Sequence, residues 1–131
     1  TLTLLGENRL IGCADASGNA CPTVISGGDL TICDSGSLKL QALVNNAAFM
    51  GAETSKISIE NCLISVFKSD ELGFDGGAFC ANGADLTMTN ATFFGRTDSD
   101  NVAVLSADTI AMTGCTLRVE AEKSVHACAP A

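Results

Sequence analysis

GGDLTICDSGSLKLQ, residues 27–41, contains two short runs in which apolar and polar residues alternate, with Asp-Ser-Gly between them. Alternation with a period of two is typical of β-strands that bury one face. A similar arrangement returns four more times within the 131 residues of the chain. The sequence is therefore organised as a repeat of strands and turns.

The five rows align on their first strand-like segment, which has Leu or Ile at the start and Leu, Ile or Met two positions later. These segments are Leu2-Thr3-Leu4, Leu30-Thr31-Ile32, Ile57-Ser58-Ile59, Leu86-Thr87-Met88 and Ile110-Ala111-Met112, and their starts lie 28, 27, 29 and 24 residues apart. Each is followed by a residue that tolerates a left-handed backbone: Asn8, Gly36, Asn61, Asn90 or Gly114. The rows predict one turn with positive φ at a fixed place in every repeat.

Two further strand-like segments complete each row. The second segments are Leu10-Ile11, Leu38-Lys39-Leu40, Cys62-Leu63-Ile64-Ser65-Val66, Ala91-Thr92-Phe93-Phe94 and Cys115-Thr116-Leu117-Arg118-Val119. The third are Thr23-Val24-Ile25, Ala48-Phe49-Met50, Ala78-Phe79-Cys80, Ala103-Val104-Leu105 and Val125-His126-Ala127. Rows differ in length mainly between the second and third segments, where the composition is that of loops.

Three short strands per repeat predict an all-β fold, a single-stranded right-handed parallel β-helix (β-solenoid) of about five coils. Equivalent strands would stack in parallel, with apolar columns inside. An antiparallel sandwich also fits short, regularly spaced strands, but it gives no reason for a turn residue in phase across every row. We expect residues 1–131 to form one β-helix domain.

The composition bears on partners and on the extent of the chain. A net charge of −8 with only seven scattered Lys and Arg residues argues against nucleic acid as a partner. No apolar run approaches the roughly 20 residues that span a bilayer, so we expect no membrane insertion. The chain starts inside a strand-like stretch, and neither end reads as a cap, so we expect it to belong to a longer chain or assembly.

The segments LTLLGENRLIG, GGDLTICDSGSLKL and ADTIAMTGCTLRV resemble the right-handed parallel β-helix repeats of secreted and surface proteins of gut Firmicutes. Such regions are often described as carbohydrate-binding domains of unknown specificity. The resemblance covers nearly the whole chain and implies an extracellular or cell-surface location, although the given chain carries no leader. It implies glycan or a neighbouring protein module as the partner.

The seven cysteines fall into phase with the repeat. Cys62 and Cys115 occupy the same slot after the turn, and Cys80 lies in a third segment. We expect most of them to be small buried side chains. The alternative is a disulfide between Cys13 and Cys21, which would close the loop CADASGNAC. Cys13, Cys21, Cys33, Cys62, Cys80, Cys115 and Cys128 show no spacing typical of a metal site.

Carboxylates gather in two loops one coil apart. Asp70, Glu71 and Asp75 lie in KSDELGFDGG, and Asp98 and Asp100 lie in RTDSDN. Three interpretations stay open for them. They can simply solvate a loop, they can bind Ca²⁺ through Asp75, Asp98 and Asp100, or they can act as an acid/base pair on a glycan, with Arg96 nearby.

Aromatic residues suggest where a sugar would stack. The chain has six Phe and no Trp or Tyr. Phe93 aligns with inward positions, whereas Phe94, Phe49, Phe79 and Phe74 are candidates for outward ones. Phe74 or Phe94, beside the acidic loops, could stack on a sugar ring.

Three functions follow from these residues. The first is a non-catalytic surface module, a scaffold or adhesin that binds glycans, with no cofactor unless Ca²⁺ is bound. The second is a polysaccharide lyase or glycoside hydrolase that uses Asp70, Asp75, Asp98 or Asp100. The third is a structural protein that associates end to end with itself. His126 is the only histidine, and we expect it to be an ordinary terminal residue rather than part of a catalytic centre.

Overall fold

The computed structural model describes residues 1–19, 21–42, 47–68, 79–97, 103–121 and 126–130. These residues contain strands and no helix, and so no helix long and apolar enough to cross a membrane. The strands are β1 (Leu2–Thr3), β2 (Glu7–Ile11), β3 (Val24–Ile25), β4 (Leu30–Cys33), β5 (Ser37–Gln41), β6 (Phe49–Met50), β7 (Lys56–Glu60), β8 (Leu63–Lys68), β9 (Phe79–Thr89), β10 (Thr92–Thr97), β11 (Ala103–Thr113), β12 (Thr116–Ala121) and β13 (His126–Pro130).

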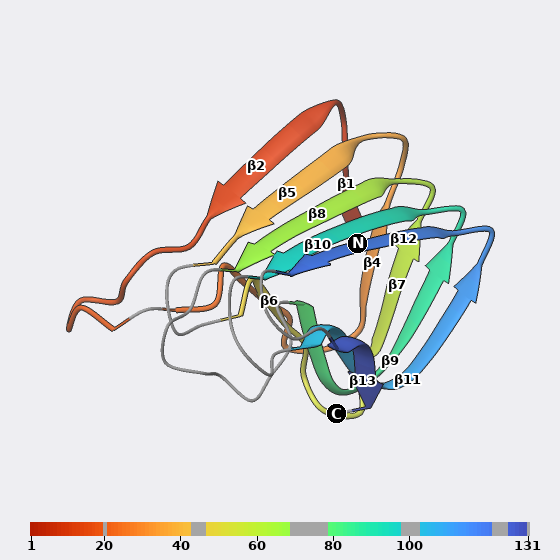
Figure 1. The fold of residues 1–131 in the computed structure, drawn as a ribbon. Helices are drawn as coiled ribbons and strands as arrows, with labels where there is room; N and C mark the ends of the chain where they lie inside the picture. The colour runs from red at the N-terminus through yellow and green to blue at the C-terminus, as the bar shows by residue number, and fades with distance from the viewer. Residues whose placement is uncertain (20, 43–46, 69–78, 98–102, 122–125, 131) are drawn as a thin grey trace.

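The strands form two sheets that face each other across the core (Figure 1). The five-stranded sheet has the order β12-β10-β8-β5-β2, with one strand from each predicted row. The eight-stranded sheet follows β1-β4-β7-β9-β11-β13, with β3 and β6 joining beside it. Every strand pairing among the described residues is parallel. The chain is thus a parallel β-solenoid, as predicted, and the antiparallel sandwich is wrong.

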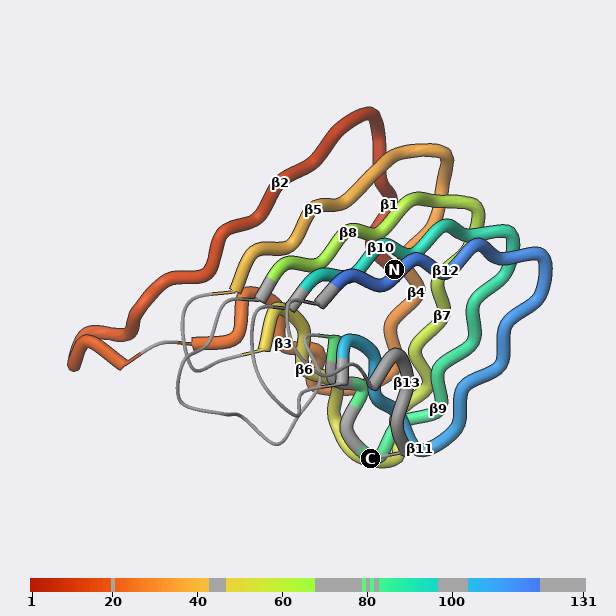
Figure 2. Tube along the Cα trace, in the orientation of Figure 1, coloured from red at the N-terminus to blue at the C-terminus, as the bar shows by residue number. Residues whose placement is uncertain are grey.

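The register places equivalent residues of successive rows above one another, as the coil trace of Figure 2 illustrates. Leu30 pairs with Ile57, which pairs with Leu86. The first row is shifted by two residues from the prediction, because Leu2 pairs with Ile32 rather than with Leu30. A shift of two keeps the same side chains facing inward, so the core pattern survives the error.

The third and first segments of adjoining rows lie in one sheet. In the later coils they are a single strand, because β9 and β11 each run through both segments, with an irregularity in their pairing between Ala107 and Thr109. The first and last coils are partial: β1 has two residues, and after β13 the described chain adds no further strand to the five-stranded sheet. The solenoid therefore has about three complete turns, fewer than the five predicted, because the first and last rows form only partial coils.

Three phenylalanines occupy the middle of the core. Phe49 and Phe79 stack with ring centroids 4.2 Å apart, and Phe93 meets Phe79 edge to face at 5.7 Å. All three side chains are fully buried. Phe93 therefore faces inward as predicted, whereas the outward placement of Phe49 and Phe79 is wrong. Phe49 and Phe79 each begin a strand of the third segment, and their stacked rings fill the core there.

The turn residues are correct in three rows and wrong in two. Positive φ occurs at Asn61, Asn90 and Gly114, which share one register position before the five-stranded sheet. In the first two rows it occurs instead at Gly6 and Asp34.

The two mispredicted residues have other roles. Asn8 lies within β2 and donates from Nδ2 to the carbonyl oxygen of Ser37 at 3.1 Å. Gly36 is needed for close approach, since a Cβ there would lie 2.6 Å from the carbonyl oxygen of Leu4 and 2.7 Å from that of Gly6. Asn8 therefore links its coil to the next by a hydrogen bond, and Gly36 lets the two coils approach closely, although neither residue has a positive φ.

Gly95 allows the two sheets to pack closely, and its replacement tests the core. A Cβ at Gly95 would lie 1.8 Å from Cγ1 of Val104 on β11. We expect Gly95→Ala to lower the free energy of unfolding by about 1–3 kcal/mol, the usual cost of overpacking, measured by urea denaturation. Gly27→Ala, where a Cβ meets nothing within 4 Å, is the matched control. Adding Val104→Ala should recover part of the loss, and the packing argument is wrong if the double variant is simply additive.

Candidate functional site: a basic and aromatic sheet face

The side of the five-stranded sheet that points away from the core carries three columns of side chains. In β5, Leu38 and Leu40 are buried while Ser37, Lys39 and Gln41 are not, and β8 and β10 alternate in the same way. We call this surface the basic–aromatic face. Its columns are Glu7-Ser37-Leu63-Thr92-Thr116, Arg9-Lys39-Ser65-Phe94-Arg118 and Ile11-Gln41-Phe67-Arg96-Glu120.

The face concentrates positive charge in an acidic chain. It holds four of the seven basic residues, Arg9, Lys39, Arg96 and Arg118, and two acidic ones, Glu7 and Glu120. Its formal charge is therefore 4 − 2 = +2, and the remainder of the chain, at −8 − 2 = −10, is strongly acidic. The fold therefore brings basic residues together on one surface, although their scattered positions along the sequence did not indicate this.

Two cation–π pairs hold aromatic rings on this face. The guanidinium of Arg96 lies 5.5 Å from the ring centroid of Phe67, and that of Arg118 lies 5.5 Å from the centroid of Phe94. Each pair joins directly opposed residues of neighbouring strands. Each such contact contributes roughly 0.5–1 kcal/mol at an exposed site, and it fixes the orientation of ring and guanidinium together.

Two shallow hollows lie side by side on the face. The first, about 370 Å³, is lined by Glu7, Asn8, Arg9, Ser37, Leu38, Lys39, Leu63 and Ser65. The second, about 350 Å³, is lined by Lys39, Gln41, Ser65, Val66, Phe67, Phe94, Arg96 and Glu120. Lys39 and Ser65 belong to both. The small Ser65 side chain leaves a gap in its column between Lys39 and Phe94, and this gap joins the hollows.

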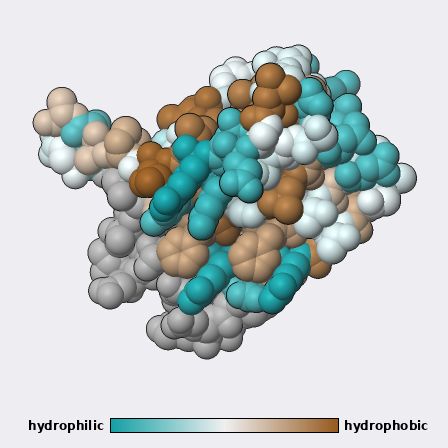
Figure 3. Space-filling view, turned by 90° about the horizontal axis from the view of Figure 1, so that it is seen from above, coloured by the Kyte–Doolittle hydropathy of each residue, from teal (hydrophilic) through white to brown (hydrophobic). Residues whose placement is uncertain are grey.

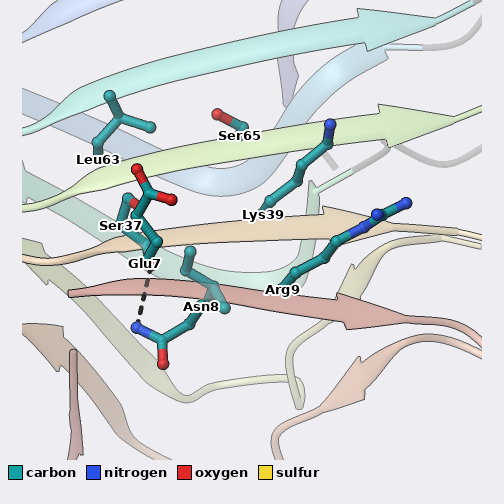
Figure 4. A pocket seen from close by; sticks show the side chains of 8 residues that line it. Glu7, Asn8, Arg9, Ser37, Lys39, Leu63 and Ser65 are labelled. Carbon is teal, nitrogen blue, oxygen red and sulfur yellow. Dashed lines mark hydrogen bonds between the residues drawn. The ribbon is translucent and has the colours of Figure 1, made fainter. Parts of the chain in front are cut away.

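The figures show how these side chains are arranged. In Figure 4, Arg9 and Lys39 extend side by side from neighbouring strands, Glu7 lies nearer the start of β2, and Asn8 points to the opposite side. Figure 3, seen from above Figure 1, shows hydrophilic and hydrophobic side chains interleaved on this side of the molecule. The surface therefore offers polar and apolar contacts within the same short span.

The outward side of the eight-stranded sheet is different in chemistry. Its central positions are Thr31, Ser58, Thr87 and Ala111, stacked in register. Beside them lie Cys33, Glu60, Thr89 and Thr113. None of these eight residues is aromatic or basic, so these positions lack the combination of rings and cations that the basic–aromatic face has.

The structure brings together two of the predicted ligand-binding residues. Phe94 and Arg96 line the same hollow from β10. The other predicted residues, Asp70, Glu71, Phe74, Asp75, Asp98 and Asp100, lie outside the described residues.

Lys39, Ser65 and Phe67 were not among the residues predicted from the sequence. A signal for them existed: once the second segments are aligned, these residues fall at outward positions of adjacent rows, where no core packing explains them. Reading the outward positions of neighbouring rows as columns would have revealed the basic–aromatic face.

The predicted Ca²⁺ ligands Asp75, Asp98 and Asp100 also lie outside the described residues. Across the described ranges, no three His, Cys, Asp or Glu side chains gather in a way that could hold a metal ion. The backbone of His126 begins β13. Ca²⁺ binding by the loop carboxylates therefore stays a prediction.

The cysteines follow the expectation only in part. Cys62 is buried, and burial raises the pKa of its thiol, so it behaves as a small apolar side chain. Cys115 occupies the equivalent register position but is half-buried, and Cys13 is exposed. The predicted Cys13–Cys21 disulfide is absent and both thiols are free. The loop neck is closed instead by a hydrogen bond from the Cys21 N–H to the Cys13 carbonyl oxygen, at 3.0 Å.

Asp15 organises this loop, which projects beyond β2 at the edge of the face (Figure 1). Its carboxylate accepts hydrogen bonds from the amides of Asn19 at 2.9 Å and Ser17 at 2.8 Å, and from the Asn19 side chain at 3.2 Å. These hydrogen bonds lower the pKa of Asp15 below its ordinary value of 3.8, and the bond from the Asn19 backbone has the largest effect.

Acidification should therefore open the loop tip at a defined pH. The lowered pKa means that the hydrogen bonds persist above 3.8 and are lost only as the pH falls through the still lower pKa of the folded state. NMR titration of the Asp15 carboxyl should give a midpoint under 3.8, with the amide shifts of Ser17 and Asn19 following the same curve. Asp15→Asn should abolish that common transition. A midpoint above 3.8 would contradict the assigned hydrogen bonds.

Comparisons with family models, curated proteins and solved structures gave no match. The fold and the face thus define the class: a parallel β-solenoid with a basic and aromatic surface on one sheet.

Proposed function

We propose that the chain is a non-catalytic β-solenoid module that binds glycans through its basic–aromatic face. The observation that carries the proposal is the pair of joined hollows, where Phe67 and Phe94 lie beside Lys39 and Arg96. Aromatic rings present flat apolar surfaces to the C–H faces of sugars, and flanking polar groups can bond their hydroxyls. A shallow, elongated hollow suits a chain-like ligand better than a small one.

The setting of the hollows supports a binding role in a rigid scaffold. The floor beneath them is the packed core, with Leu38, Val66 and Phe93 all buried. The central lining side chains sit on β5, β8 and β10, which have a paired strand on both sides, and this lowers the entropic cost of ordering them on binding. We further propose an extracellular or cell-surface setting, supported by the resemblance to surface β-helix repeats.

A glycan array with a hollow-filling variant tests this function. Ser65→Ile fills the gap shared by both hollows with a residue that favours strands. We expect glycan binding to fall at least about tenfold, since a displaced ligand loses contacts in both hollows. Ser58→Ile makes the same change at an outward position of the eight-stranded sheet and should bind as the native chain does.

The outcome is decisive in both directions. If no glycan binds the native chain, or if Ser58→Ile reduces binding as much as Ser65→Ile, the face is not a glycan site. Running the array with and without Ca²⁺ tests the predicted role of Asp75, Asp98 and Asp100. Release of cleaved oligosaccharide by the native chain, lost on Asp75→Asn with Asp98→Asn, would establish the enzyme alternative instead.

Self-association is a second candidate, favoured by the exposed ends of the core columns. Leu10 faces inward above Leu40 yet is 42% exposed, and Leu117 faces inward beside Phe93 yet is 37% exposed. Leu10 lies on β2 and Leu117 on β12, the two edge strands of the five-stranded sheet. An edge strand offers unpaired backbone groups to another chain, so coils of two copies could continue one another.

Light scattering at increasing protein concentration tests this association. We expect the apparent mass to rise with concentration and the rise to vanish in Leu10→Lys, because a charge at the exposed column end opposes stacking. Leu63→Lys is the control: Leu63 is 40% exposed on the outward side of the sheet, so this variant should leave the rise intact. A constant apparent mass for the native chain would remove this candidate.

A further inference from the structure

We propose that the glycan bound by the basic–aromatic face is a polyuronate, an acidic polysaccharide whose carboxylates are bound around Lys39 and Arg9. This inference rests on the proposed function and specifies its ligand. The relevant juxtaposition is a pair of adjacent cations, Arg9 and Lys39, in the first hollow. The second hollow, which Lys39 also lines, contains the sugar-stacking rings of Phe67 and Phe94.

Arg9 and Lys39 are directly opposed on neighbouring strands. Like charges at such a position repel each other, because opposed Cβ atoms lie only about 4.5–5.5 Å apart. Within the described ranges neither side chain forms an ion pair with a carboxylate. Arg9 donates to the amide oxygen of Gln41 at 2.9 Å, a neutral partner that leaves its charge uncompensated. A ligand carboxylate between the two cations would relieve the repulsion.

The guanidinium of Arg9 keeps donors for such a ligand. Its hydrogen bond to Gln41 uses one of five N–H groups, so a planar fork remains for a carboxylate, which Arg binds in bidentate fashion. Lys39 lies at the junction of the hollows and is exposed. Its mobile ammonium can therefore follow a carboxylate in either hollow.

The rest of the face suits sugars better than other polyanions. Glu7 lines the first hollow and Glu120 the second, where Oε1 of Glu120 is ion-paired with Arg118 at 2.6 Å. The remaining acceptor positions of both carboxylates can take hydrogen bonds from sugar hydroxyls. Those same carboxylates, and a remainder of the chain at −10, repel the closely spaced phosphates of nucleic acid. A polyuronate carries one carboxylate on each sugar ring, so its charges are widely spaced. Its carboxylates can bind the cations of the face, and its hydroxyls can donate to Glu7 and Glu120.

The size of the face fits an oligosaccharide. Its central column crosses five strands from Arg9 to Arg118, a span of about 19 Å at roughly 4.8 Å per strand spacing. Cations lie toward both ends, with Phe94 and Ser65 between them. Several sugar rings of one chain can therefore meet both the stacking ring and the cation pair.

The test compares acids with their uncharged esters. Oligomers of polygalacturonate and alginate, each with its methyl-esterified form of equal length, are titrated calorimetrically into the native chain. We expect at least one acid to bind about tenfold or more tightly than its ester, and this preference to shrink with added salt. Lys39→Gln should lower affinity for the acid by about tenfold, the worth of one charge-assisted hydrogen bond, and should lower affinity for the ester by a clearly smaller factor.

Lys56→Gln is the matched control. It removes the same charge from an exposed position on the eight-stranded sheet, so net charge falls equally in both variants. Equal losses in the two variants would mean that overall charge, rather than the site, governs binding, and would overturn the inference. Neither variant should unfold at a lower urea concentration than the native chain, which separates lost binding from lost structure.

The remaining outcomes separate this inference from the function on which it rests. If acid and ester bind equally, or if only neutral glycans bind and Ser65→Ile abolishes that binding, the polyuronate is wrong while the glycan module stands. If neither acids nor any glycan on the array binds, both fail. If a single-stranded oligonucleotide or an acidic peptide binds as tightly as the polyuronates, the face is a general anion site and the inference is wrong.

Discussion

The parallel hydrogen-bond ladder between successive coils is the constraint on which the rest of this structure depends. It requires each strand to lie over its own equivalent one turn earlier, so every residue meets a residue of like position. Ile57, for example, lies between Leu30 and Leu86. A side chain that packs well in one coil then packs well in all of them. This is why the chain repeats its pattern although its rows differ in length.

The same ladder makes some positions intolerant of any side chain. Where a turn of one coil crosses the backbone of the next, only glycine leaves room, as at Gly36 over the carbonyl oxygens of Leu4 and Gly6. At Gly114 a Cβ would meet Oδ1 of Asn90 in the coil beside it, at 2.5 Å. Glycine thus serves two purposes in this fold, close approach and positive φ, and a sequence pattern alone does not separate them.

That ambiguity explains what could be predicted and what could not. Period-two alternation revealed the strands and the stacking of rows two to five, because core burial imposes it directly. The first row was misaligned by two residues, since its coil has a neighbour on one side only and its Leu10 is left partly exposed. Phe49 was misplaced for a different reason: it lies in a two-residue strand beside a corner, where alternation has too few residues to indicate a face.

The candidate site was harder to foresee because nothing in the core specifies it. Outward side chains are under no packing constraint, so alternation within one row does not mark Lys39 and Phe67, and only the comparison of outward positions across aligned rows reveals them. They become neighbours of Arg9 and Arg96 only through the register. Yet this freedom is what makes the face informative. A core that is stable by itself can tolerate two opposed cations on its surface, and the modest penalty they impose is one that a bound anion removes. The ladder holds the cations in place whether or not the anion is there, so the energy of binding need not be spent on assembling the site.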